Sequence, residues 1–97
     1  MRFPDWNKAE LIMHSNKRTE KYQIKQDGYI ACEAVTSNRA GYWILINNQL
    51  IVNSGASDGT DVDSNTVPVK KDDIVECRYM QSGTSAYTLV YFIPFRR

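Results

Sequence analysis

Few residues of this chain have the types and spacing that catalysis requires. A hydrolytic triad needs a base beside a nucleophile, and His14 is the only histidine in the 97 residues. Cys32 and Cys77 lie far apart and lack the paired spacing of a zinc or redox motif. We therefore predict two buried thiols, with a disulfide as the alternative, no catalytic residues and no enzyme activity.

Oxygen ligands are concentrated in residues 54–66, which contain three aspartates and an asparagine: Asp58, Asp61, Asp63 and Asn65. Calcium prefers several oxygen ligands from a flexible loop, and the last three of these residues match the first three ligand positions of an EF-hand loop. Thr66, however, stands where that loop requires glycine, and Pro68 interrupts the coordinating backbone. We therefore predict solvated turn residues and no metal or other cofactor, with bound calcium as the alternative.

Exposed aromatic rings are a third source of chemistry, because they can stack on sugar rings. The chain has two tryptophans, Trp6 and Trp43, and six tyrosines. Most of these rings are expected in the core. Trp43 alternates with Tyr42, however, so one of these two rings faces outward or into a subunit contact unless both faces of the sheet are covered.

The composition is that of a folded soluble protein. Hydrophobic residues make up 42% of the chain and aromatic residues 11%, while the net charge is only +1. The basic residues form no continuous stripe, so nucleic acid is not an expected partner. The N-terminus lacks the apolar run of a signal peptide, and the longest apolar stretch, residues 42–46, is too short to cross a membrane. We predict one domain over residues 1–97 without membrane insertion.

Strand patterns dominate the chain after its first quarter, where β-branched and aromatic runs are separated by turn residues. Residues 28–36 alternate with period two, and their core face is expected to hold Ile30, Cys32 and Ala34. Glycine accepts a positive φ angle at little cost, so Gly28 suits the turn that delivers the chain into this strand.

Residues 41–53 contain the clearest hairpin, because two apolar runs flank Asn47–Asn48 and asparagine tolerates the left-handed conformation of a tight turn. Residues 54–66 then contain no large apolar side chain except Val62, which predicts a long exposed loop. A loop of that length in a small domain often has a function.

The last third of the chain continues the strand pattern. The predicted elements are an extended segment at 67–70 with Pro68 on a sheet edge, a turn at 71–73, a strand at 74–80, a turn at 81–85 and a last strand at about 86–95. Both faces of the last strand are largely apolar, as in a central strand or one buried under a neighbouring subunit. Residues 1–26 suit either a strand or a short leading helix, and we favour extended structure. The sequence thus predicts an all-β, antiparallel sandwich of about eight short strands.

Several segments together resemble the small β-sandwich head domains at the C-terminal tips of phage and prophage tail fibres and tail needles. The segments are Pro4–Asp5–Trp6, Asp27–Gly28–Tyr29–Ile30, Ile46–Asn47–Asn48, the VPVKKDDIV run at 67–75 and the closing Tyr91–Phe92–Ile93–Pro94–Phe95. Asn48 and Asp72 stand where such domains frequently have glycine. The resemblance implies a homotrimeric jelly roll, related in shape to the tumour-necrosis-factor and C1q domains, with receptor contacts on surface loops.

On this resemblance we predict a non-catalytic virion module, assembled in the host cytoplasm, that forms the trimeric tip of a tail fibre. Its expected partners are a host-surface glycan or protein receptor and other virion proteins. The expected receptor-binding residues lie in the two predicted loops: Ser57, Asp58, Thr60, Asp61, Ser82 and Thr84. The alternatives are a capsid-decoration or tail-needle knob protein and a monomeric carbohydrate-binding module with an exposed tryptophan.

Overall fold

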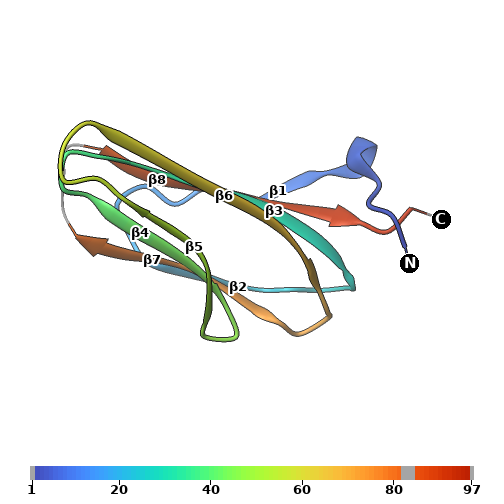
Figure 1. Ribbon diagram of the computed structural model, residues 1–97. Coiled ribbons are helices and arrows are strands. Elements are labelled where there is room, and N and C mark those ends of the chain that lie inside the picture. Colours follow the sequence, from blue (N-terminus) through green and yellow to red (C-terminus); the bar gives the residue numbers. More distant parts are fainter. Residues whose placement is uncertain (1, 82–84, 97) are drawn as a thin grey trace.

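The computed structural model describes residues 2–81 and 85–96, and in these ranges eight strands form two four-stranded antiparallel sheets (Figure 1). A single turn of 3-10 helix, η1 (Trp6–Lys8), precedes them. The strands are β1 (Glu10–Met13), β2 (Glu20–Gln23), β3 (Gly28–Ser37), β4 (Gly41–Ile46), β5 (Gln49–Gly55), β6 (Thr60–Val69), β7 (Ile74–Gln81) and β8 (Ser85–Pro94). The predicted all-β sandwich is confirmed.

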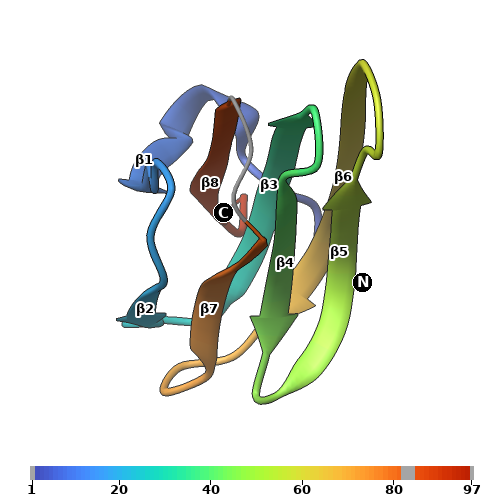
Figure 2. The ribbon, with the colours of Figure 1, turned by 90° about the vertical axis from the view of Figure 1, so that its left-hand side faces the viewer.

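The strand pairing is that of a long hairpin rolled up on itself. β1 pairs with β8, β2 with β7, β3 with β6 and β4 with β5, so the bend of the hairpin lies between β4 and β5. Rolling adds the pairs β3–β8 and β4–β7 and gives the sheet orders β1-β8-β3-β6 and β2-β7-β4-β5 (Figure 2). This order is that of a jelly roll.

Two predicted turns use non-glycine residues in the left-handed conformation. Asn47 and Asn48 join β4 to β5 with φ angles of 49° and 68°, which confirms the predicted hairpin. Asp72 has a φ angle of 77° in the turn between β6 and β7. Asparagine and aspartate tolerate this region better than other non-glycine side chains, so both turns form without glycine at Asn48 and Asp72.

Gly28 has a different role from the predicted one. It is the first residue of β3, and a Cβ atom built there lies 2.6 Å from the Ile93 carbonyl oxygen and 2.6 Å from the Phe92 ring. Its φ angle is not in the left-handed region. Glycine is therefore required because β8 packs closely against this backbone, and not because a turn needs a positive φ.

The core lies between the sheets and is filled by the inward positions of both. Ile30, Cys32 and Ala34 of β3 are buried as predicted, opposite Ile44 and Val75 of the second sheet. Tyr42 is also fully buried, with its hydroxyl donating to the Arg18 carbonyl oxygen. Trp43, the next residue, is half-buried on the outer side of the sheet. The alternation therefore resolves which of the two rings faces outward.

The prediction of a long loop at residues 54–66 was wrong. β5 continues to Gly55, and after a short turn β6 begins at Thr60 and pairs with β3 along its whole length. β6 is an edge strand, and its inner side is polar because its side chains bond the backbone of β5. Pro68 lies on this edge strand, as predicted.

The N-terminal quarter is mainly extended, as favoured, with η1 as its one helical turn in the described residues. The Asp5 backbone N–H donates to the Pro94 carbonyl oxygen at 2.8 Å, which ties this segment to the end of β8. Ile93 is on the outward side of β8 yet fully buried, and η1 contacts β8. Within the described residues, the chain forms no helix of the length and apolarity needed to span a bilayer.

Candidate functional site

The turns after β3 and β5 meet at the end of the molecule farthest from both termini (Figure 1). Asn38 and Arg39 have left-handed backbones, with φ angles of 47° and 76°. The Asn38 backbone N–H donates to the Gly59 carbonyl oxygen at 2.9 Å, and the Gly59 N–H donates back to the Asn38 Oδ1 at 3.1 Å. These bonds hold the two turns together as one distal surface.

The predicted receptor-binding residues do not share one environment. Ser57 and Asp58 are exposed on the β5–β6 turn, on the distal surface. Thr60 is the first residue of β6, where its hydroxyl bonds the Ser37 hydroxyl at 3.1 Å. Asp61 points inward, and its carboxylate accepts hydrogen bonds from the Ser54 hydroxyl and the Gly55 backbone N–H. Ser82 and Thr84 lie outside the described residues.

Inward-facing side chains of β6 form a ladder with the edge of β5. The Asp61 Oδ2 accepts a hydrogen bond from the Gly55 backbone N–H at 2.9 Å, and the Asp63 Oδ2 accepts one from the Asn53 backbone N–H at 2.9 Å. The Asn65 amide donates to the Ile51 carbonyl oxygen at 3.1 Å. Side chains two residues apart on one strand thus bond backbone groups two residues apart on the other, and they bridge the sheets where no backbone pairing exists.

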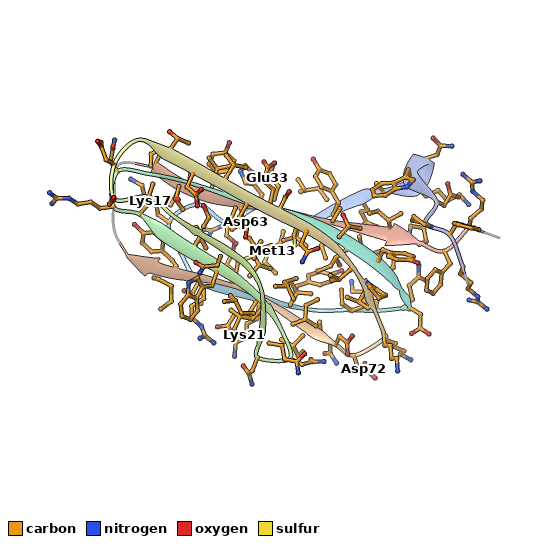
Figure 3. The ribbon with its side chains drawn as sticks, viewed as in Figure 1. Met13, Lys17, Lys21, Glu33, Asp63 and Asp72 are labelled. Carbon is orange, nitrogen blue, oxygen red and sulfur yellow. The ribbon has the colours of Figure 1, made fainter. Side chains whose placement is uncertain are left out.

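This side-chain ladder gives Asp61 and Asp63 a structural role. Their carboxylates point between the sheets, as Figure 3 shows for Asp63, and accept N–H groups of β5. Across the part of the chain that the structure describes, no cluster of three or more His, Cys, Asp or Glu side chains is arranged to hold a metal ion. The EF-hand-like spacing is accounted for by the period of a strand and not by a calcium loop.

The outward face of the β1-β8-β3-β6 sheet is an apolar surface, which we call the apolar face. Its residues are Leu11, Tyr29, Ala31, Glu33, Val35, Val62, Ser64, Thr66, Pro68, Tyr87, Leu89 and Tyr91. Leu11 is 46% exposed, Val62 55% and Tyr91 38%. Among these described residues Glu33 alone is charged, and Figure 3 shows it on the outer side of the sheet. Leu11 and Tyr91 are direct neighbours in the register, so their exposed apolar side chains lie side by side on this face.

The outward face of the β2-β7-β4-β5 sheet, which we call the charged face, carries an ion pair. The Arg78 Nη2 lies 2.9 Å from the Glu76 Oε1, and the Glu76 side chain is only 11% exposed. The hydrogen bond from Arg78 holds the pKa of the Glu76 carboxyl below its ordinary value. Lys21 is paired with Glu76 in the register and adds a second cation to this face.

Beside this ion pair the charged face is hollowed next to Trp43. Trp43 lies between Asn53 of β5 and Arg78 of β7. Two residues along the hairpin, in the next pair on the same face, Gly41 lies opposite Gly55. Two glycines side by side leave the surface without side chains there, and the resulting Trp43 hollow has a volume of about 740 Å³. Sequence reasoning missed this hollow, although Gly41 at the start of the predicted hairpin and Gly55 two residues beyond its end were the available signal.

The groups considered for nucleophilic catalysis are unsuited to it. Burial raises the pKa of the Cys32 thiol to about 12, with the nearby Cys77 adding to the effect. Burial also raises the pKa of Cys77, to about 11, and both thiols are free. His14 is exposed, with its ring edge-on to Tyr87. Thiols held protonated in a core are inert. Both thiols are buried and free, so the prediction of buried thiols is confirmed over the alternative disulfide.

Comparison with protein-family models, with curated protein sequences and with solved structures finds no match to this chain.

Proposed function

We propose that this chain is a non-catalytic adhesion module that assembles as a homotrimer through its apolar face. The observation that carries the proposal is the apolar face itself, with Glu33 as its single charge. Exposed apolar side chains cost free energy in water, and they are removed from it when the apolar faces of three copies meet around a threefold axis. The proposed context is the tip of a phage or prophage tail fibre, where the distal surface contacts a host receptor.

The positions of the ends and turns support this arrangement. Both termini lie at one end of the molecule and the distal surface lies at the other, as Figure 1 shows. Chains packed side by side through the apolar face would present their distal surfaces together at one end. Ser57 and Asp58 would then be repeated around the assembly, and weak contacts to a receptor would add up through multivalency.

The test of this proposal is the solution mass of the purified chain, measured by light scattering over a range of concentrations. We expect a mass of three times 11.2 kDa that persists on dilution. A monomer at every concentration would overturn the trimer and favour the monomeric carbohydrate-binding module, because Trp43 lies on an open surface in either case. A stable dimer would retain assembly through the apolar face but would reject threefold symmetry.

A further inference from the structure

The Trp43 hollow has the composition of a ligand site that no part of the assembly uses. It lies on the charged face, so it stays open when the apolar face is covered by other copies. Ser57, from the turn of the distal surface, lies at its rim. A volume of about 740 Å³ is within the range of small-ligand sites.

We propose that the Trp43 hollow is a carbohydrate-binding subsite that holds one ring of a surface glycan against the indole of Trp43. This proposal rests on the proposed receptor-binding function and names the class of receptor. Trp43 supplies the stacking surface, and the hollow formed by Gly41 and Gly55 supplies the space for the ring.

The chemistry of the lining favours a sugar over an apolar ligand. The negative face of an indole attracts the C–H bonds on one side of a sugar ring. Asn53, Ser57 and Arg39 also line the hollow, and side chains of these types suit ring hydroxyls and an acidic substituent. Within the described residues, neither the Trp43 indole N–H nor the Asn53 side-chain amide bonds another group, so both are available to a ligand.

The hollow is also preformed, which lowers the cost of binding. Its base is the β4–β5 hairpin, whose register is fixed by pairing from Gly41 to Ile46. The Gly55 backbone is held in place from the side by its hydrogen bond to Asp61. At the rim, the Arg39 backbone N–H donates to the Ala56 carbonyl oxygen and fixes the turn that carries Ser57.

The experiment measures glycan binding with Trp43 as the reporter. The chain has only two tryptophans, so Trp6→Phe leaves Trp43 as the single emitter. The probes are purified oligosaccharides that end in glucose, galactose, N-acetylglucosamine or a sialic acid, together with a bacterial lipopolysaccharide O-chain. We expect at least one probe to change the Trp43 emission and to bind an immobilised array of the same glycans, with Trp6→Phe binding like the unaltered chain.

Two variants test whether the ring occupies the hollow. Trp43→Ala should weaken binding by roughly tenfold or more, as for a central aromatic contact. Gly55→Val should weaken binding strongly while keeping Trp43, because its new side chain would occupy the space beside the indole that the sugar ring needs. A Cβ at Gly55 lies 3.9 Å from its nearest neighbour and the backbone is extended, so this variant should fold and gain thermal stability.

The outcomes separate this inference from the function on which it rests. A trimer that binds glycans equally well with Gly55→Val has its receptor site elsewhere, and the Trp43 subsite is then wrong while the adhesion function stands. A trimer that binds none of the probes overturns the glycan class. A monomer that binds glycans through Trp43 keeps the subsite and overturns the trimeric assembly.

Discussion

The two outward sheet faces of this protein have the same strand alternation but opposite chemistry. The apolar face exposes Leu11, Val62 and Tyr91 and has Glu33 as its only charge. The charged face carries the Glu76–Arg78 ion pair and is hollowed beside Trp43. Because both sheets cover one core, the core does not require this difference. The proposed function accounts for it by assigning the apolar face to contact with other copies of the chain and the charged face to contact with solvent and ligand.

The largest expected effect comes from placing a charge on the apolar face. Tyr91 lies between Leu11 and Ala31 in the register, near the middle of the sheet. Tyr91→Asp would bury a carboxylate at the subunit contact, so the concentration for trimer dissociation should rise by about a hundredfold or more. Light scattering measures the change in mass.

The matched control for this substitution is Leu50→Asp on the charged face. Leu50 is 47% exposed, close to the 38% of Tyr91, but belongs to the other sheet. Leu50→Asp should leave the solution mass of the protein unchanged. Dissociation by Leu50→Asp and not by Tyr91→Asp would reverse the assignment of the two faces.

The two buried thiols show whether Tyr91→Asp only dissociates the trimer or also unfolds the chain. Cys32 and Cys77 have pKa values raised from 9.0 to about 12 and about 11. At pH 8 the native chain should hold about a thousandfold and a hundredfold less thiolate at these positions than the unfolded chain. A disulfide reagent that releases a coloured thiolate should therefore react slowly until denaturant is added, in Tyr91→Asp as in the unaltered chain. Rapid labelling of the native variant would mean that the substitution opens the core.

An intermediate effect is expected at the side-chain ladder between the two sheets. Asp61→Ala removes the acceptor for the Gly55 N–H and should lower the free energy of unfolding by about 1–3 kcal/mol. Asp58→Ala, on the exposed turn, should change it by less than about 0.5 kcal/mol. Urea denaturation measures both. Equal stability of the two variants would contradict a structural role for Asp61.

The smallest effect concerns the ion pair of the charged face. The pKa of Glu76 is lowered on folding, so its contribution to stability is present above its ordinary value of 4.5 and is lost as the pH falls below it. Glu76→Gln should cost about 1 kcal/mol or less at pH 7, because Arg78 is partly exposed and screened by solvent. The difference between the two stability curves should shrink as the pH falls below 4.5. A constant difference from pH 7 to pH 3 would show that the charge is not responsible.

Local patterns were sufficient to predict most strands and turns. Asn47–Asn48 and the alternation of Ile30, Cys32 and Ala34 depend on neighbours in the chain, so they were visible in the sequence. The last strand was also expected to be apolar on both faces, and its outer side proved to lie on the apolar face.

The features that were missed depend on distant residues. β6 looked like a loop because its polar side chains find their partners on β5, which no local pattern shows. The role of Gly28 depends on Phe92 and Ile93, far along the chain. Asp61 was assigned to a receptor surface for the same reason, since its partner Gly55 is reached only when the two sheets pack.

The ladder of Asp61, Asp63 and Asn65 also protects the protein against misassembly. β5 ends its sheet, and such a strand offers unpaired N–H and C=O groups that can recruit a strand from another chain and start fibril growth. Here side chains of β6 already occupy backbone groups of Ile51, Asn53 and Gly55. A strand from another chain would therefore find these backbone groups of the β5 edge already bonded.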